Sequence, residues 1–284
     1  MSVNTVGVLG CGLMGSGIAQ VSASAGFKTY VLEVNDSALQ KGMGRIEKFL
    51  ADGVAKGKLS AQGRDTTIGH LVGTTRYADL EACELIIEAI IENVEEKKKA
   101  YAQVEAVVGV DCLIATNTSS LSVTELAAGT KRPSQFGGLH FFNPVPLMKL
   151  VEVVKALTTS AQTHEALVDY ARAIGKEPIA APDRGGFIVN RLLVPYLLDA
   201  IRCLDEGLGT VEDIDKGMKL GCGYPMGPFT LLDFVGLDTT YFIANILFDE
   251  FRETRFAPPP LLKRMVLAGH LGKKSGKGFY EYSR

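Results

Sequence analysis

Residues 5–15 read TVGVLGCGLMG, and this stretch decides the fold of the N-terminal half. Thr5–Leu9 has the short apolar pattern of a buried strand, and an apolar helical stretch follows the turn. The turn between them is G-x-G-x-x-G, formed by Gly10, Gly12 and Gly15. In this strand–turn–helix context, backbone N–H groups and the positive end of a helix face a pyrophosphate. The stretch therefore predicts a Rossmann-type dinucleotide-binding domain.

The glycines and a later acid indicate which dinucleotide binds. Gly10 permits the tight turn, Gly12 lets the backbone approach the phosphates, and Gly15 lets helix and strand pack closely. A second strand, Thr29–Glu33, ends in an acid 23 residues after Gly10, near the ~20-residue offset of a ribose-binding carboxylate. Such a carboxylate accepts hydrogen bonds from the ribose 2′-OH and repels a 2′-phosphate, so we expect NAD rather than NADP. A glycine-rich turn that binds nothing is the alternative, and the full context disfavours it.

Composition excludes several classes of protein. The chain has 284 residues, enough for one large or two ordinary domains, and its 46% hydrophobic content is typical of a protein with a real core. The net charge of −2 provides no electrostatic footprint for nucleic acid or an anionic membrane. No apolar run reaches the ~18 residues that would span a bilayer. The first strand begins almost at once, so we expect no signal peptide and a cytoplasmic protein.

The cysteines show no metal-binding or disulfide pattern. They lie apart, without C-x-x-C spacing, at Cys11, Cys83, Cys112, Cys203 and Cys222. We therefore predict no metal site and no disulfide framework, but reduced thiols that act as small core residues. Cys11 lies inside the glycine turn, so we expect an alkylating reagent to block cofactor binding there without Cys11 being catalytic.

The pattern of the chain changes near residue 184. Up to that point strand-like and helix-like stretches alternate, with further buried strands expected at Leu85–Ala89 and Leu113–Thr116. Beyond it strand signals mostly stop, and Phe187–Glu206 reads as a long helix that is apolar around most of its circumference. Such a helix is usually buried in a core or an oligomer interface. We expect an NAD-binding domain at residues 1–184 and an all-α substrate-binding and dimerisation domain at 185–284.

Two adjacent strands bring a histidine and a glutamate together. Phe136–Phe142 and Leu150–Val154 are joined by a proline-containing link too short for a helical crossover, so the strands should be antiparallel. His140 and Glu152 lie symmetrically about Pro146, which predicts a cross-strand pair with Cβ atoms about 5 Å apart. A carboxylate on one ring nitrogen fixes the tautomer and stabilises the imidazolium, and histidine is the usual acid–base group for hydride transfer from a carbinol.

The remaining polar candidates are weaker. The other histidines sit among polar or loop-like neighbours and are expected at the surface: His70, His164 and His270. A hydroxyl of the segment after Thr116 could orient substrate or nicotinamide, although a helix cap is the preferred interpretation for Ser120 or Ser122. Asn190 lies near the start of an apolar helix, where either a cleft between the domains or a structural contact would satisfy its amide.

The sequence favours ordinary structural roles for one charged run and one aspartate. Most of the run Glu95–Lys99 is expected on a solvated helix face. Asp238 is a candidate cap for a helix that runs towards Phe251.

Four segments together resemble the 3-hydroxyacyl-CoA dehydrogenases. They are Asn117–Ser120 (NTSS), Leu139–Pro146 (LHFFNPVP), Gly186–Arg191 (GFIVNR) and Gly223–Pro228 (GYPMGP). They occur in the family's order, and the resemblance covers essentially the whole chain. It is strongest to the short single-function enzymes, which include 3-hydroxybutyryl-CoA dehydrogenases. The implied fold is α/β, with a doubly wound, mostly parallel sheet that has an antiparallel edge hairpin, followed by an all-α domain.

The resemblance also implies an activity and site residues. The activity is oxidation of an (S)-3-hydroxyacyl-CoA to a 3-ketoacyl-CoA with NAD, or the reverse, by a homodimer joined through the C-terminal domain. His140 matches the catalytic histidine and Glu152 its orienting glutamate, whereas Ser119 and Asn190 match contacts to the reacting oxygen. Lys56, with Lys58 nearby, would approach the CoA nucleotide. The implied cofactor site comprises Gly10, Gly12, Leu13, Met14, Gly15, Glu33, Glu92, Lys97, Asn117, Ser119 and Asn143.

One position departs from the family pattern, and two other functions remain open. Glu33 stands where an aspartate is commoner, and the preference for NAD should survive the extra methylene. A lambda-crystallin-like dehydrogenase of a free sugar acid would share the architecture but not a dependence on CoA. A catalytically silent NAD-binding protein would bind NADH without turnover, and the His140–Glu152 pair argues against it.

Overall fold

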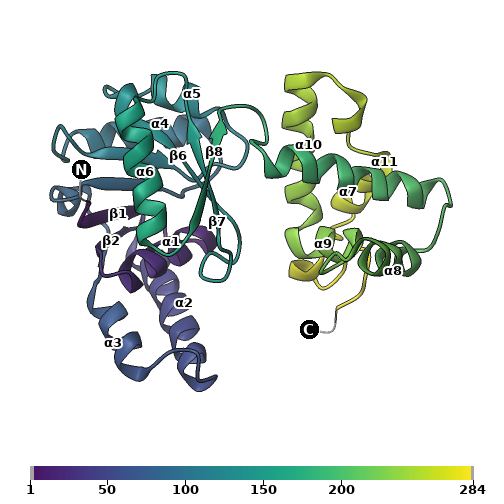
Figure 1. The fold of residues 1–284 in the computed structure, drawn as a ribbon, viewed down its shortest axis with the longest axis horizontal. Coiled ribbons are helices and arrows are strands. Elements are labelled where there is room, and N and C mark those ends of the chain that lie inside the picture. The colour runs from purple at the N-terminus through teal and green to yellow at the C-terminus, as the bar shows by residue number, and fades with distance from the viewer. Residues whose placement is uncertain (1–2, 283–284) are drawn as a thin grey trace. The chain divides into compact units, whose positions relative to one another are not determined.

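The computed structural model describes residues 3–282. The chain forms two compact units, Met1–Arg184 and Gly185–Arg284. The first unit is a sheet covered by helices, and the second consists of helices with short 3₁₀ turns (Figure 1).

An eight-stranded sheet in the order β3-β2-β1-β4-β5-β6-β7-β8 forms the centre of the first unit. Its strands are β1 (Thr5–Leu9), β2 (Lys28–Leu32), β3 (Leu71–Thr74), β4 (Leu85–Glu88), β5 (Leu113–Thr116), β6 (Phe136–Phe141), β7 (Leu150–Lys155) and β8 (Glu177–Pro182). All neighbours are parallel except β6 and β7, which are antiparallel. The predicted fold class is confirmed. The expected position of the hairpin at the edge is wrong, because β8 pairs with β7 and forms the edge itself.

The described residues of the first unit, 3–184, form the helices α1 (Leu13–Ser24), α2 (Asp36–Ala55), α3 (Ala61–Gly69), α4 (Val94–Glu105), α5 (Val123–Ala128) and α6 (Ala161–Ala173). Short 3₁₀ turns lie at Tyr77–Leu80 and Pro133–Gln135. Side-chain oxygens of five residues accept the N–H three positions further on and so cap the starts of α2 to α6: Asn35, Ser60, Asn93, Ser122 and Ser160. The cap predicted for Ser122 is confirmed, whereas Ser120 is not a cap and bonds elsewhere.

The core of the first unit is formed by the two faces of the sheet. Central strands are buried on both sides, as in β6, where all six residues are buried. Apolar side chains of the strands pack on the inner faces of α1, α2 and α6, for example Ile18, Ile46 and Leu167. This packing fixes the carboxyl ends of β1, β4 and β5, the edge at which open α/β sheets bind ligands.

The second unit contains α7 (Val189–Asp205), α8 (Val211–Cys222), α9 (Pro228–Val235), α10 (Leu237–Phe251) and α11 (Pro260–Leu267), with 3₁₀ turns at Thr254–Phe256 and Lys273–Ser275. Its separate core is built on α7, α9 and α10 around residues such as Leu198, Phe229 and Leu247. The predicted cap at Asp238 is wrong. Gly236, with a φ of 103°, is the N-cap of α10, and Asp238 lies in the first turn beside Lys274.

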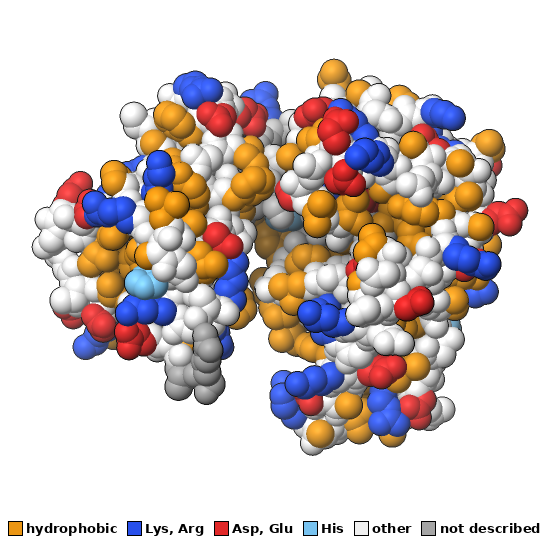
Figure 2. Space-filling model, turned by 180° about the vertical axis from the view of Figure 1, so that it is seen from behind, with side chains coloured by type: hydrophobic (Ala, Val, Ile, Leu, Met, Phe, Trp, Pro, Cys, Tyr) orange, Lys and Arg blue, Asp and Glu red, His pale blue; other side chains and the backbone are white. Residues whose placement is uncertain are grey.

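No single helix within residues 3–282 has the length and apolar character needed to cross a membrane. Among the helices of this described part of the chain, α9 and α10 pass that test when taken together, as a pair bent by 94°. On the face drawn in Figure 2, basic and acidic side chains are interspersed over both units.

Candidate active site

The glycine turn has the geometry that a dinucleotide site requires. Gly10 adopts a φ of +87°, and its N–H donates to the carbonyl of Leu32 at 2.8 Å. A Cβ on Gly15 would lie 1.9 Å from the carbonyl oxygen of Gly10, so α1 can approach the turn only with glycine there. A Cβ on Gly12 would meet nothing within 4 Å. The space in front of Gly12 is therefore open, next to the first N–H groups of α1, which have no partner within the helix.

Glu33 lies beside this turn. One carboxylate oxygen accepts the Cys11 N–H at 2.6 Å, and the other accepts the Val34 N–H at 3.0 Å. The two bonds hold the carboxylate between the end of β2 and the glycine turn. Leu13 and Met14, in the first turn of α1, are exposed and half-buried respectively.

His140 and Glu152 form the predicted pair. They are directly opposite in the β6–β7 register, and Nδ1 of His140 lies 2.6 Å from Oε2 of Glu152, with both side chains buried. Since an ionised carboxylate only accepts, Nδ1 carries a proton and donates it to Glu152. In the neutral ring Nε2 is then the nitrogen that accepts a hydrogen bond. This is the arrangement of an oriented general base.

Ser119 faces the other ring nitrogen. Its Oγ lies 3.1 Å from Nε2 of His140, so the hydroxyl donates to the neutral imidazole. Ser119 follows β5, whereas His140 lies on β6 and Glu152 on β7, so three neighbouring strands supply one hydrogen-bonded row. The tilted ring of Phe142 lies against His140, with ring centroids 4.6 Å apart.

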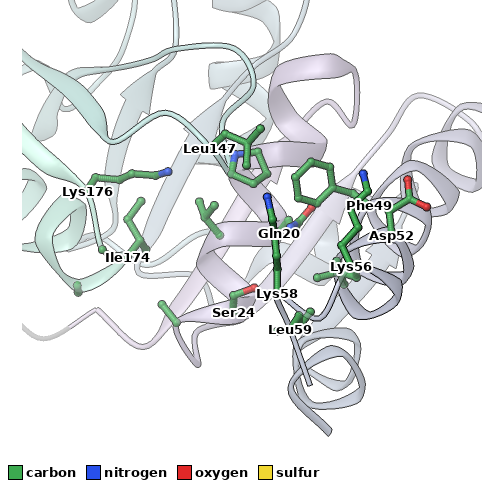
Figure 3. Close-up of a pocket in the computed structure, with 17 residues that line it drawn as sticks. Gln20, Ser24, Phe49, Asp52, Lys56, Lys58, Leu59, Leu147, Ile174 and Lys176 are labelled. Atoms are coloured by element: carbon green, nitrogen blue, oxygen red, sulfur yellow. The ribbon is translucent and has the colours of Figure 1, made fainter. Parts of the chain in front are cut away.

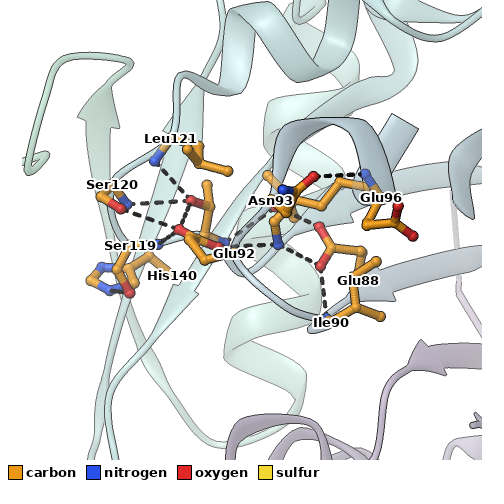
Figure 4. Close-up of polar contacts among 12 residues, drawn as sticks. Glu88, Ile90, Glu92, Asn93, Glu96, Ser119, Ser120, Leu121 and His140 are labelled. Atoms are coloured by element: carbon orange, nitrogen blue, oxygen red, sulfur yellow. Dashed lines mark hydrogen bonds and ion pairs between the residues drawn. The ribbon is translucent and has the colours of Figure 1, made fainter. Parts of the chain in front are cut away.

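Glu92 connects this row to a buried ion cluster (Figure 4). One of its oxygens accepts from the Ser119 N–H at 3.2 Å, from the Ser120 hydroxyl at 3.3 Å and from the Thr118 hydroxyl. The other oxygen pairs with Nζ of Lys97 at 3.2 Å. Lys97, which the family resemblance sets apart from the rest of the 95–99 run, has a side chain that is 1% exposed because it lies between carboxylates.

Sequence reasoning overlooked Glu88. It is the last residue of β4, is fully buried, and pairs with Lys97 at 2.6 Å. In the sequence, Glu88 stands out as an acid at the end of an apolar strand. A carboxylate buried there requires a partner, which points to a polar or charged contact.

The remaining predicted residues are distributed as follows. Asn117 accepts the Phe141 N–H at 3.0 Å and so ties the end of β5 to β6. Asn143 is exposed, in a loop after β6, and forms a cis peptide bond with Pro144. Asn190 lies half-buried in the first turn of α7, in the second unit. Lys56 caps the C-terminus of α2.

A cavity of about 640 Å³ opens on the first unit, and Figure 3 shows the side chains around it. Phe49, Lys56 and Lys58 come from α2 and the loop after it, and Leu147 and Lys176 approach from the opposite side. Nζ of Lys176 donates to the carbonyls of Val145 and Met148, and burial lowers its pKa. The cavity combines ammonium groups with apolar surface.

Cys11 is less reactive than its place in the glycine turn suggested. Burial, reinforced by the nearby Glu33 carboxylate, raises the pKa of the Cys11 thiol to about 11. The thiolate is the nucleophile, so at neutral pH this thiol is almost entirely in its unreactive form. We therefore expect iodoacetamide to modify the exposed Cys222 well before Cys11, as mass spectrometry of a time course would show. Faster labelling of Cys11 would contradict this description of the turn.

Comparison with known proteins agrees with the geometry of both units. Residues 5–184 match the family described as 3-hydroxyacyl-CoA dehydrogenase, NAD binding domain, and residues 186–282 match the 3-hydroxyacyl-CoA dehydrogenase, C-terminal domain. The chain belongs to the 3-hydroxyacyl-CoA dehydrogenase family. It is an NAD-dependent oxidoreductase.

Individual relatives are similar to this chain over nine tenths or more of their length. A 3-hydroxybutyryl-CoA dehydrogenase of Mycobacterium tuberculosis is 47% identical over 283 residues, which is 99% of each chain. The mitochondrial hydroxyacyl-coenzyme A dehydrogenase of Homo sapiens is 44% identical over 288 residues, covering 99% of this chain and 91% of that protein. The crystal structure of (S)-3-hydroxybutyryl-CoA dehydrogenase PaaH1 from Ralstonia eutropha has a TM-score of 0.96 and 43% identity, and both chains are covered completely.

The first unit fits its cofactor. The open space at Gly12 lies where a pyrophosphate would approach the start of α1, and Glu33 holds an acceptor beside it. When bound, NAD accepts or donates a hydride, and the chain must supply the proton transfer.

Proposed function

We propose that the protein oxidises the 3-hydroxyl of short (S)-3-hydroxyacyl-CoA thioesters, 3-hydroxybutyryl-CoA above all, and catalyses the reverse reduction. The observation that carries this proposal is the buried Glu152–His140–Ser119 row, since it presents one basic nitrogen beside one hydroxyl at the ligand-binding edge of the sheet. Two similar proteins are named as 3-hydroxybutyryl-CoA dehydrogenases, which supports a short acyl chain in the substrate. We assign NAD binding to residues 1–184, and dimerisation and the rest of the substrate site, beyond His140, Ser119 and the CoA cavity, to residues 185–284.

The chain's own residues supply the proton transfer. Nε2 of His140 accepts the proton of the substrate hydroxyl as the C3–H bond is broken, and Glu152 stabilises the imidazolium that forms. Ser119 donates to the oxygen as it becomes a carbonyl, and Asn190 is assigned the same task. In the reducing direction His140 returns the proton. Glu92 and Lys97 border the cofactor, with Glu92 the more accessible at 28% side-chain exposure.

We assign the nucleotide portion of CoA to the cavity beside α2. Lys56 and Lys58 offer positive charge for phosphate groups, and Phe49 and Leu147 offer apolar surface for a purine. Neither His140 nor Ser119 lines this cavity. The pantetheine arm therefore has to carry the acyl group from it to the catalytic row.

Exposed apolar side chains in the second unit support a homodimer. Leu192, Leu220 and Leu267 are large apolar residues with most of their surface exposed, and apolar residues that gather on a surface are typical of interfaces. The cytoplasm is the assigned compartment, because the described cysteines are all free.

Substitution Glu152→Gln tests the orienting role. The amide leaves the geometry nearly unchanged but removes the charge that favours the imidazolium. We expect kcat to fall about 100-fold, within the range of a general acid–base contribution, while the dissociation constant of NADH changes less than about twofold. Stopped-flow turnover and NADH fluorescence titration measure the two quantities. Unchanged kcat would show that Glu152 does not orient the base.

The substrate class is tested in the oxidising direction. Purified protein is given NAD with (S)-3-hydroxybutyryl-CoA, and NADH formation is followed by absorbance. The (R) enantiomer is the matched control, and a series of longer (S)-acyl chains follows. We expect formation of NADH with the (S) thioester and a declining kcat/KM as the chain lengthens. Equal rates with both enantiomers would overturn the assignment.

A further inference from the structure

The catalytic row is attached to a cluster of charged residues that includes Glu88, a buried residue with no part in the reaction described above. Glu88 and Lys97 have side-chain exposures of 0% and 1%, and Glu92 pairs with the same ammonium group. Two carboxylates thus share one lysine at the carboxyl ends of β4 and β5. The cluster lies where the sheet binds ligands rather than in the centre of the core.

Glu88 is the anchor of this cluster. Its Oε1 accepts from Lys97 Nζ at 2.6 Å and from the Ile90 N–H at 2.8 Å. Its Oε2 accepts from the Tyr101 hydroxyl at 2.7 Å and the Thr116 hydroxyl at 2.9 Å. Four donors, from the loop after β4, from α4 and from β5, therefore hold this one carboxylate of β4. Burial and the Glu88 charge raise the pKa of Tyr101 well above its usual value, so its hydroxyl remains a donor.

Stability alone is a poor reason for such a cluster. Burying an ion pair carries a large desolvation cost for each ion, and apolar residues of similar volume often replace one without loss of stability. What a fully bonded buried network does provide is a fixed arrangement of its members.

The fixed arrangement leads directly to the catalytic row. Lys97 holds one oxygen of Glu92, and the other oxygen of Glu92 receives the Thr118 hydroxyl and the Ser119 N–H. The Thr118 hydroxyl also accepts the N–H groups of Ser120 and Leu121. The backbone on either side of Ser119 is therefore held by Glu92, and the Ser119 hydroxyl points at Nε2 of His140 (Figure 4).

We propose that Glu88 is a positioning residue for this reaction, which acts through Lys97 and Glu92 to hold the Thr118–Ser120 turn so that Ser119 faces His140. The catalytic meaning of this inference rests on the proposed function. Neutralising Glu88 removes the nearer anion of Lys97, so the Lys97 ammonium moves towards Glu92. The Glu92 carboxylate shifts with it and no longer holds the Thr118–Ser120 turn in place. The Ser119–His140 hydrogen bond is then lost without any change in either residue.

Nitrogen NMR of the histidine side chains reads that hydrogen bond directly. The chain has four histidines, so selective ¹⁵N-histidine labelling gives few resonances, and the His140→Gln spectrum assigns those of His140. The spectrum of Ser119→Ala marks where the Nε2 resonance lies when the bond is absent. In Glu88→Gln we expect the His140 Nε2 resonance to move towards that position, while resonances of His70, His164 and His270 stay in place.

Turnover provides the second readout. We expect Glu88→Gln to lower kcat about 10–100-fold, since a misplacement of about 1 Å can cost about 100-fold, with little change in KM. In the Ser119→Ala background the same substitution should lower kcat less than about twofold, because residues that act as one unit are not additive. The control is Glu96→Gln on α4, the helix that carries Lys97. Glu96 is exposed and pairs with Lys99, so no effect on kcat is expected.

The outcomes separate this inference from the proposed function. A wild-type protein that turns over no acyl-CoA would refute the function, whereas the NMR shift would still test the positioning role. An unmoved His140 resonance, equal losses of kcat in both backgrounds, or shifts in all four histidines would overturn the role of Glu88. If Glu88→Gln does not fold, Glu88→Gln/Lys97→Met removes both buried charges and takes its place, with the same results expected.

Discussion

Substitution His140→Gln should lower kcat by about 10²–10⁴, the range that a positioned general acid–base supplies. Glutamine fits the same strand position and can still bond to Glu152, but no ring nitrogen remains to take the proton of the substrate hydroxyl. NADH affinity should change little, because neither the glycine turn nor Glu33 contacts His140 through any bond described for residues 3–282. Single-turnover absorbance and NADH fluorescence measure the two effects separately.

The control for this experiment is His70→Gln. His70 ends α3, and its Nδ1 bonds to the Thr66 carbonyl, away from the catalytic strands. Turnover by His70→Gln should equal that of the wild type. Near-normal kcat in His140→Gln would remove His140 from the mechanism, whatever the control shows.

Substitution Gly12→Ala should abolish most NADH binding without unfolding the protein. A Cβ at Gly12 meets no protein atom within 4 Å, so the free energy of unfolding should be unaffected. The methyl group would instead occupy the space predicted for the pyrophosphate. Loss of one or two hydrogen bonds to a charged group, about 1.5–3 kcal/mol, corresponds to a 10–100-fold weaker affinity. Fluorescence titration and thermal denaturation test the two halves of the prediction.

Substitutions at two other glycines serve as comparisons for Gly12→Ala. Gly15→Ala should lower both affinity and melting temperature, because its Cβ would overlap the Gly10 carbonyl. Gly44→Ala, in the interior of α2 with nothing within 4 Å, should leave NADH affinity unchanged. If Gly12→Ala binds NADH as tightly as the wild type, the cofactor does not approach this turn.

The sequence predicts those strands and contacts that depend on the local apolar pattern and on the symmetry of a hairpin. The bounds of β1 and β5 agree with the expected ones, because each is a short apolar run between polar segments. The His140–Glu152 pair followed from the length of a hairpin link and the two-residue period of a strand, and the observed register confirms it.

The parts that could not be predicted depend on contacts made in three dimensions. β3 is four residues long, contains Gly73 and follows two polar helices, so its partner β2 rather than its own pattern makes it a strand. Lys97 lies in a charged run that usually faces solvent, and it is buried because Glu88 and Glu92 reach it from β4 and the following loop. The extra strand β8 removes the expected hairpin from the edge.

The most direct test of the central claim is NADH absorbance when the purified protein meets acetoacetyl-CoA, with free acetoacetate as the control. The account predicts rapid oxidation of NADH with the thioester and none with the free acid, because the CoA portion binds the protein while His140 donates the proton. Equal oxidation with both compounds, or none with either despite measurable NADH binding, would contradict it.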